Sequence, residues 1–347
     1  MKFNTKALLA VAGLATCALT PANAYEGGAV NTQPGAFIGS SAGVPPPGIY
    51  MFNQVFTDQR NFTGPGTTAL GLGGHSSLHI NDYTAGFLFV PGWTFLGATY
   101  DAVLVQPFVD VALGSPVGSP VTPGTTSGGF NTYIVPVELS WKLGTSGFAV
   151  KTGLGIYVPT GTENNHLVPG QAGLSNVGNP WYTFQPEIIL SYLKDGYNLS
   201  AAIYEEFNTA DRFNQYTNGD VFHVDFTATK TIGKWTFGPV ASYVAQVTND
   251  KCGADCQALG FTTLTNAQRF QVFAVGGLVE YNFGPASLSV WATQDVLAKA
   301  SNAAASQPNP VTGGTDLSLI SRGTTVFTTV SFRLWAPEAP AAPLIHK

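Results

Sequence analysis

Apolar and polar residues alternate along most of the chain after residue 48. Such a period of two is typical of β-strands whose two faces meet different surroundings. In one regular stretch, Leu199, Ala201 and Ile203 share one face, while Ser200, Tyr204 and Glu206 share the other. The twelve segments with this pattern are about 49–57, 78–90, 94–110, 130–143, 147–158, 181–193, 197–207, 220–231, 234–248, 269–283, 286–298 and 324–335. The chain is therefore predicted to be all-β.

The connections between these segments are sorted by length. The short ones are Pro91-Gly92-Trp93, Gly144-Thr145-Ser146, Lys194-Asp195-Gly196, Gly233 and Phe283-Gly284-Pro285. Long connections, such as 111–129, 159–180, 249–268 and 299–323, alternate with them and come first and last. Bacterial outer-membrane barrels have an even number of strands, short periplasmic turns and long outer loops. Residues 49–335 are therefore predicted to form a transmembrane antiparallel up-and-down β-barrel of about 12 strands, with both of its ends on the periplasmic side.

Composition supports a barrel that faces lipid. Charged residues make up 10% of the chain, against about 25% in soluble domains. Beyond the first residues, no run of about 18 apolar residues could cross a bilayer as a helix, whereas a closed barrel satisfies its backbone without one. The net charge of −5 comes with no basic patch, which argues against a nucleic-acid partner. A soluble secreted β-protein has the same periodicity with its apolar face inward, and remains an alternative.

The N-terminus has the layout of a secretory signal peptide. Lys2 and Lys6 precede an apolar stretch over 7–19, and Ala22-Asn23-Ala24 provides an A-x-A site. We expect residues 1–24 to be removed by cleavage after Ala24; a lipoprotein signal at Cys17 is the alternative. The expected location is the cell outer membrane. Residues 25–48, rich in Gly, Ser and Pro, are predicted to be a periplasmic lead-in or a partial plug, and 336–347 a periplasmic tail.

Two cysteines remain after this processing, Cys252 and Cys256. In an oxidising compartment a pair this close predicts a small disulfide loop. A metal site would need further ligands, and no histidine lies nearby, so no metal is expected.

Several motifs resemble the outer-membrane transporter family described as "putative meta-pathway of phenol degradation", also called SphA-like proteins. The matching stretches are Glu26-Gly27-Gly28, Pro45-Pro46-Pro47-Gly48-Ile49-Tyr50, Gln106-Pro107-Phe108-Val109-Asp110-Val111, Gly155-Ile156-Tyr157-Val158-Pro159-Thr160-Gly161, Trp181-Tyr182-Thr183-Phe184-Gln185-Pro186, Tyr204 to Asn208, Phe222-His223-Val224-Asp225 and Gln246-Val247-Thr248-Asn249-Asp250. The resemblance implies an outer-membrane barrel, often encoded near genes for breaking down aromatic or other hydrophobic compounds. In one departure from outer-membrane strands, which usually end the chain with an aromatic residue, Trp335 is followed by a Pro- and Ala-rich tail.

A barrel in lipid places apolar residues outward and polar residues inward. On this parity the candidate residues of the lumen and permeation path are Glu138, Lys151, Glu187, Glu206, His223, Asp225, Glu280 and Arg333. They either pair across the lumen and set selectivity, or are solvated wall residues. Asp82 and Asp101 are left unassigned, because Gln106-Pro107 indicates a bulge that resets parity. The girdles expected at the membrane interfaces contain Trp93, Trp141, Trp181, Trp235 and Trp335.

The lumen contains two residue types of a catalytic triad, His223 and Asp225, but the chain has no G-x-S-x-G motif. We expect neither an enzyme nor a cofactor. The expected function is a channel for passive uptake of small hydrophobic or aromatic compounds. Its expected partners are those solutes, outer-membrane lipid and lipopolysaccharide, and the barrel-assembly machinery. A structural or adhesive barrel whose loops bind partners is the alternative from another class.

Overall fold

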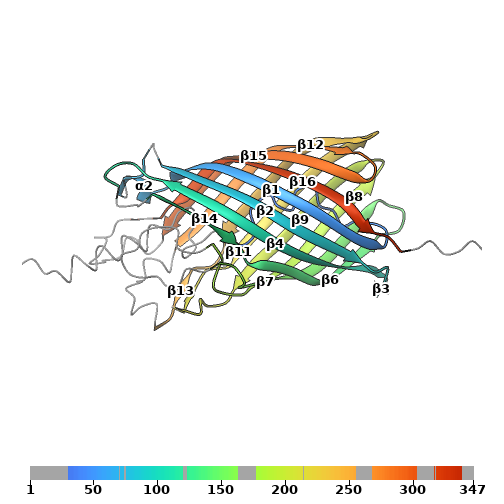
Figure 1. Ribbon diagram of the computed structural model, residues 1–347, viewed down its shortest axis with the longest axis horizontal. Coiled ribbons are helices and arrows are strands. Elements are labelled where there is room, and N and C mark those ends of the chain that lie inside the picture. The colour runs from blue at the N-terminus through green and yellow to red at the C-terminus, as the bar shows by residue number, and fades with distance from the viewer. Residues whose placement is uncertain are drawn as a thin grey trace, which may run out of the picture.

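The computed structural model describes residues 30–69, 71–73, 76–119, 123–162, 177–213, 215–254, 268–302, 316 and 318–337. Twelve long strands of this part of the chain form a closed antiparallel barrel (Figure 1). They are β1 (Gly48–Thr63), β2 (Ser77–Val90), β4 (Ala98–Gly114), β6 (Thr132–Lys142), β7 (Phe148–Val158), β8 (Thr183–Lys194), β9 (Tyr197–Asn208), β11 (Val221–Ile232), β12 (Trp235–Gln246), β14 (Gln268–Asn282), β15 (Ala286–Asn302) and β16 (Ile320–Trp335). The prediction of an all-β, 12-stranded barrel is confirmed.

The barrel closes between its first and last strands. β1 pairs with β16 from Ile49↔Trp335 to Thr63↔Ile320, and every other barrel strand pairs with its neighbours in the chain. The first strand is longer than predicted, because the alternation continues through Asp58, Arg60 and Phe62. Closure satisfies the edges of the sheet, as a barrel in lipid requires.

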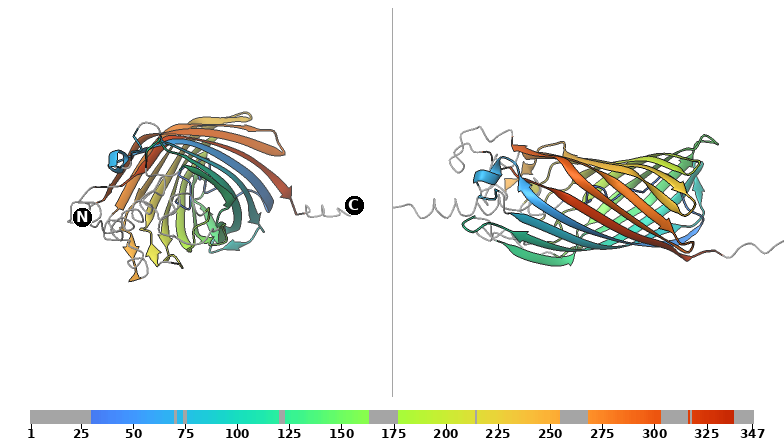
Figure 2. Two further views of the ribbon diagram at one scale, coloured as in Figure 1. Left: turned by 60° about the vertical axis from the view of Figure 1, so that its left-hand side comes forward. Right: turned by 90° about the horizontal axis from the view of Figure 1, so that it is seen from above.

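The short connections and the long connections lie at opposite ends of the barrel (Figures 1 and 2). We call the end with the short connections the turn end and the other the loop end. At the turn end, Asp195 and Gly196 join β8 to β9 with φ values of +53° and +77°, the left-handed conformation of a tight hairpin. The shorter elements are α2 (Gly66–Ala69), β3 (Thr94–Phe95), β5 (Gly124–Gly129), β10 (Tyr216–Thr217) and β13 (Lys251–Cys252). No helix among the described residues is long and apolar enough to cross a membrane.

The ladder is irregular in one part of the wall. The register shifts between Asp101 and Val103 of β4, and between Ile134 and Glu138 of β6, around Pro136. Proline has no N–H to donate, so it interrupts a ladder. The bulge was expected at Gln106-Pro107, but both of these residues keep their places opposite β2. The extra residue lies in β6: the inward residues are Tyr133 and Val135 before Pro136, and Glu138 and Ser140 after it, so parity is reset there and not in β4.

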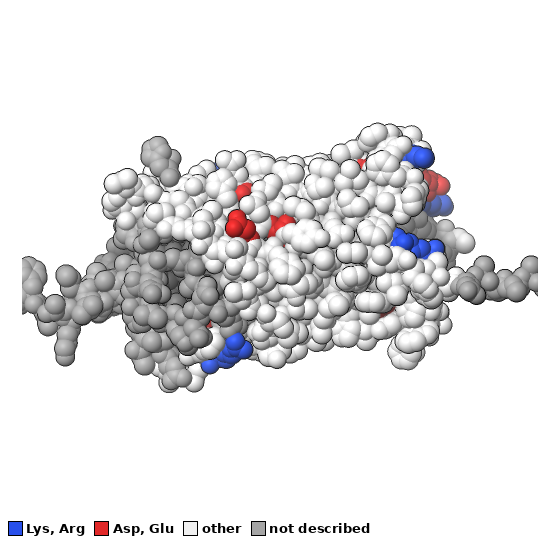
Figure 3. All heavy atoms as spheres, in the orientation of Figure 1, with Lys and Arg blue, Asp and Glu red and all other residues white. Residues whose placement is uncertain are grey.

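The outer face is apolar as predicted. Large hydrophobic side chains are exposed along the strands, including Leu199, Phe226 and Phe237. Most of the face in Figure 3 carries no charged atoms, and its basic atoms lie toward the two ends. Trp93, Trp235 and Trp335 are exposed at the turn end, but Trp181 is 2% exposed and packs inside, so its expected place in a girdle is wrong.

The inner face is not uniformly polar, and here the predicted inward parity was too simple. A cluster of inward apolar side chains contains Phe56, Leu78, Ile80, Trp291 and Phe327. Trp291 stacks on Phe327 with ring centroids 4.9 Å apart. These groups avoid water by packing against each other and against Ile38 of the N-terminal segment. One wall of the lumen is consequently hydrophobic.

Residues 30–47 lie inside the barrel. Val30 packs against Trp181, Val221 and Ile320 near the loop end, and Gly48 begins β1 at the turn end. Between these points Ala36, Ile38 and Ser40 each donate a backbone hydrogen bond to the residue three positions earlier. Gly35 and Gly39 have φ values of +90°, which favour glycine. We call residues 30–47 the lumen segment; it runs the length of the barrel as a string of turns.

Candidate functional site

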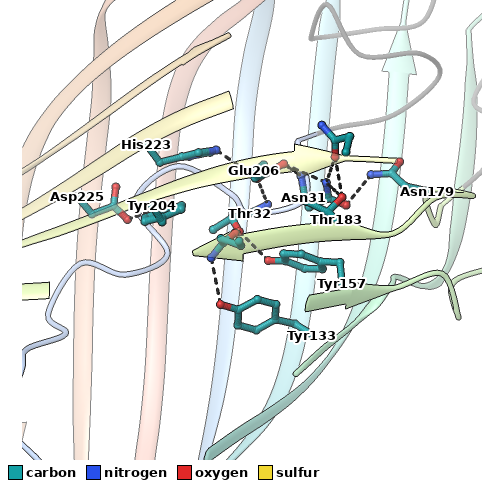
Figure 4. Close-up of polar contacts among 12 residues, drawn as sticks. Asn31, Thr32, Tyr133, Tyr157, Asn179, Thr183, Tyr204, Glu206, His223 and Asp225 are labelled. Atoms are coloured by element: carbon teal, nitrogen blue, oxygen red, sulfur yellow. Dashed lines mark hydrogen bonds and ion pairs between the residues drawn. The ribbon is translucent and has the colours of Figure 1, made fainter. Parts of the chain in front are cut away.

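Glu206, on β9, holds the start of the lumen segment (Figure 4). Its two carboxylate oxygens accept hydrogen bonds from the backbone N–H groups of Asn31 (3.2 Å) and Thr32 (2.9 Å). The Asn31 side chain donates a third, at 3.0 Å, and its own Oδ1 accepts from Asn179. Backbone amides in a turn segment need partners once they are buried, and this fully buried carboxylate supplies them.

Asp225, on β11, holds the next turn in the same way. Its carboxylate accepts from the backbone N–H groups of Gly35 and Phe37, both at 3.0 Å, and from the Tyr204 hydroxyl at 3.2 Å. Thr227, two residues further along β11, accepts from the Gly39 N–H at 2.8 Å. Inward polar side chains of β9 and β11 thus accept the backbone hydrogen bonds of the lumen segment, as a neighbouring strand would in a sheet.

His223 lies between these two carboxylates on β11 and is completely buried. Its Nε2 is 3.2 Å from Glu206 Oε1, and its ring stacks on Tyr204 with centroids 4.6 Å apart. Neither ring nitrogen has a hydrogen-bond partner of acceptable geometry, and Asp225 is engaged by the lumen segment. Asp225 therefore does not hold the His223 ring by a hydrogen bond, as the acid of a catalytic triad would.

Lys151, on β7, forms the centre of a buried ionic cluster. Its Nζ lies 3.1 Å from Asp101 Oδ2 and 3.2 Å from Glu138 Oε2. Two carboxylates around one ammonium satisfy its charge where water is scarce. The structure therefore pairs Glu138 with Lys151 between neighbouring strands of the wall, not across the lumen, and adds Asp101, which the sequence left unassigned.

A second ionic cluster was missed. Arg60 pairs with Asp58 at 3.3 Å and with Asp295 across the barrel seam, and it also donates to Ser321 and Thr325. The sequence did contain a sign that Asp58 and Arg60 face inward, because they continue the inward parity of the first strand. The partner on β15 could not be read from the sequence, because it lies 235 residues away.

An elongated cavity of about 520 Å³ remains between the lumen segment and the wall formed by β1, β2, β4, β6, β7, β8 and β14 to β16. It reaches from Leu78, near the loop end of β2, to Leu88, near its turn end. Most of its lining is apolar, with Ile80, Val105 and Val135 in the middle. Small lipophilic molecules bind favourably to a surface of this kind, because their transfer from water to it lowers the free energy in proportion to the apolar area that is buried.

Two glycines on β7 shape the polar side of this cavity. A Cβ at Gly155 would lie 2.2 Å from the Tyr133 hydroxyl, so the bare backbone leaves room for the Tyr133 ring. A Cβ at Gly153 would lie 3.1 Å from Glu187 Oε1. Tyr133 stands against Tyr157, with ring centroids 4.6 Å apart. Large side chains of β6 and β8 can therefore meet over the thin strand between them.

Comparison with known families decides the relationship. The sequence profile of the family described as "Putative MetA-pathway of phenol degradation" matches residues 57–305. The chain belongs to this family. The resemblance noted from the sequence motifs is thereby confirmed.

One solved structure has the same fold as this chain, and two others are less similar. An outer membrane channel from Pseudomonas putida F1 superposes with a TM-score of 0.62, at 11% identity, over 87% of this chain and 100% of that chain. The β domain of the Bordetella autotransporter BrkA gives a TM-score of 0.44 at 11% identity, covering 83% and 100%. The CymD monoaromatic hydrocarbon channel gives 0.39 at 9% identity, covering 85% and 90%. No curated protein sequence matches at a significant level.

The remaining candidate residues have different surroundings. Glu280 lines the cavity and accepts a hydrogen bond from Ser289. Arg333 is exposed at the turn end, where it donates to the Pro47 carbonyl oxygen. The expected disulfide falls outside the described residues, because they include neither Cys256 nor the Cys252 side chain. The expected signal peptide and most of the tail lie outside them too.

Proposed function

We propose that this family member is an outer-membrane channel for the passive uptake of small hydrophobic or aromatic compounds. The observation that carries the proposal is the elongated, largely apolar cavity beside the lumen segment. A channel for ions or sugars needs a wet path lined by polar groups, whereas here the polar inward groups of β9 and β11 are occupied by the lumen segment.

The size of the cavity supports small solutes. Its volume of about 520 Å³ lies in the range of sites for small molecules. The names of the family and of the CymD channel, which refer to phenol degradation and to monoaromatic hydrocarbons, agree with this solute class. We further propose that the barrel is inserted in the outer membrane after cleavage behind Ala24, with 336–347 as a periplasmic tail.

The test is uptake by intact Gram-negative cells, whose lipopolysaccharide layer slows hydrophobic solutes. Cells that produce the protein should take up labelled toluene faster than cells without it. Val135→Trp should return uptake to the background rate, because Val135 is 1% exposed and lines the cavity. Val137→Trp is the matched control, because Val137 is exposed on the outer face of the same strand.

Equal amounts of both variants in the outer membrane, checked by immunoblot, make the comparison valid. Uptake that is unaffected by Val135→Trp would overturn the channel proposal. It would leave a structural or adhesive barrel as the alternative.

A further inference from the structure

Three basic residues lie on the outer face of the barrel toward its loop end. Arg269 on β14, Lys299 on β15 and Arg322 on β16 are all exposed. The three strands are neighbours in the sheet (Figure 2). Each basic residue is next in the chain to a residue that faces the interior, namely Phe270, Ala298 and Ser321. Because successive residues of a strand face opposite sides, the three basic side chains point away from the lumen.

The strand pairing keeps these basic residues close together. Lys299 pairs with Gln271 in the ladder between β14 and β15, so it lies diagonally opposite Arg269 on the same face. Residues in this diagonal relation are roughly 7–8 Å apart, within reach of long side chains. Arg322 follows on the next strand, where it pairs with Asn61 of β1. The three residues therefore form one basic patch, which we call the outer basic patch.

The outer basic patch lies at the height of the lipid headgroups. Arg269 is twelve residues from Tyr281 along β14, and Arg322 is thirteen residues from Trp335 along β16. Tyr281 packs against Trp235 at the turn end, where Trp335 is also exposed. Tilted strands rise roughly 30 Å along the membrane normal over this length. The apolar band of an outer-membrane barrel is about 25 Å tall, so the patch stands just above it on the loop side.

Below the outer basic patch the same three strands are apolar. Val275 of β14, Val296 of β15 and Val330 of β16 are 39–48% exposed on the outer face. Acyl chains of a lipid can cover these side chains while its headgroup reaches the basic patch. The surface therefore matches a lipid with a negatively charged headgroup at two levels.

An open groove of about 500 Å³ adjoins Arg322 at the seam between β1 and β16. Its lining includes the polar side chains of Gln59, Asn61 and Gln294. Arg322 donates through Nε to the carbonyl oxygen of Asp295, and its two terminal amino groups have no hydrogen-bond partner in the described part of the chain. An arginine with free amino groups binds phosphate oxygens through paired, charge-assisted hydrogen bonds.

The acidic residues around the outer basic patch face elsewhere. Glu280 and Asp295, on β14 and β15, line cavities inside the barrel. Asp110 is exposed, but it lies on β4, which is separated from β16 by β1 and β2. The outward positive charge of β14 to β16 is thus not neutralised by acidic residues of these strands, and it attracts anionic groups in the headgroup region.

We propose that Arg269, Lys299 and Arg322 bind the phosphate groups of lipid A, the lipid part of lipopolysaccharide, against the outer face of β14 to β16. Lipid A has phosphates and several acyl chains, and it belongs to the leaflet that the loop end of an outer-membrane barrel faces. The inference rests on the proposed insertion in the outer membrane and not on what passes through the barrel.

Native mass spectrometry of the purified full-length protein in detergent tests this site. The wild type should bind lipid A roughly tenfold more tightly than lipid A from which both phosphates have been removed, because each basic residue near a membrane surface adds to the attraction for anionic lipid. It should also prefer lipid A to phosphatidylglycerol. Arg269→Gln/Lys299→Gln/Arg322→Gln should bind both forms of lipid A equally.

The matched control is Lys142→Gln/Lys194→Gln/Lys234→Gln. It removes three exposed basic residues at the turn end and should keep the preference for phosphorylated lipid A. Arg269→Gln/Lys299→Gln is a second variant in case the first does not assemble. It leaves the hydrogen bond of Arg322 to β15 in place and should lose most of the preference.

Three results would overturn the lipid A site. They are equal affinities of the wild type for the two forms of lipid A, a preference that survives in the variants of the outer basic patch, and phosphatidylglycerol binding as tight as that of lipid A. The last result would show a general surface for anionic lipids. Because toluene uptake is measured separately, each of these results would leave the channel proposal intact.

Discussion

Neighbouring residues of a strand face two different environments, lipid on the outer side and the barrel interior on the inner side. In β11, Phe226 is 44% exposed on the outer face, whereas its neighbours Asp225 and Thr227 are buried against the lumen segment. The alternation is therefore a physical partition between lipid and interior. A one-residue slip of β11 would put His223 and Asp225 into hydrocarbon, which is why the register of this strand is strongly specified.

A substitution at the middle of β11 tests this assignment. Phe226→Arg places a charge on the lipid face and should lower the free energy of unfolding by about 2–4 kcal/mol if the site is near the midplane. Ile232→Arg, at the turn end of the same strand and 60% exposed, should cost only about 0–1 kcal/mol. Urea unfolding of both variants in lipid vesicles measures the difference. Equal costs would mean that β11 does not cross the membrane as described.

Among the elements, the lumen segment depends most on partners far away in the chain. Glu206 and Asp225 together accept four of its backbone N–H groups. Removing these acceptors leaves buried donors unpaired, and water then competes for them. The lumen segment and the cavity share the barrel interior, so the position of the segment decides how wide the open passage through the barrel is.

Release of the lumen segment should widen the path. In Glu206→Ala/Asp225→Ala the four amides lose their acceptors, so we expect the single-channel conductance in planar bilayers to rise severalfold. Glu205→Ala removes a carboxylate from the outer side of the same strand and should leave the conductance unchanged. A double variant that conducts like the wild type would show that these contacts do not hold the segment in place.

The two-stranded sheet of β10 and β13 at the loop end should respond to pH. Asp250 accepts from the Tyr216 hydroxyl, the Gly219 N–H and the Gln246 amide at 2.7–2.8 Å. Burial nevertheless raises the pKa of Asp250 to about 7. A folded-state pKa above the unfolded value means that the folded sheet of β10 and β13 binds the proton more tightly, so its stabilisation is lost as pH rises toward about 7.

Limited proteolysis measures this effect. Cleavage between β12 and β14 should be slower at pH 5 than at pH 8, relative to an unstructured reference peptide cut by the same protease. Asp250→Asn, which carries no titrating proton, should show no such difference. A pH dependence that persists in Asp250→Asn would assign the titration to another group.

At the scale of the whole molecule, the barrel is asymmetric between its ends. The turn end carries short hairpins, and the loop end carries β5, β10 and β13 (Figure 2). In outer-membrane barrels the long loops face outward. This asymmetry predicts one orientation in the membrane.

Cysteine labelling in intact cells tests that orientation. In a Cys252→Ser/Cys256→Ser background, Val117→Cys at the loop end should react with a membrane-impermeant maleimide. Lys234→Cys, in the β11–β12 turn, should react only after lysis. Both positions are exposed, so a reversed pattern would mean that the barrel is inserted the other way round.

The sequence by itself determined the strands, the outward parity and the sorting of loops. These follow from local alternation, since each residue of a strand meets either lipid or the interior whatever its distant partners are. That is why Glu206, His223 and Asp225 could be placed inward from their own neighbourhoods alone. Short connections that contain Gly or Asp also correctly marked where most of the strands end.

Only the tertiary structure decided how the interior is used. The hydrogen bond from Thr32 to Glu206 spans 174 residues and that from Gly35 to Asp225 spans 190, and no periodicity encodes such pairs. Phe56, Trp291 and Phe327 form an apolar wall where a polar lining was expected, because those side chains pack against Ile38 and against each other. Burial inside a narrow barrel depends on what else occupies it, and that is a property of the folded molecule.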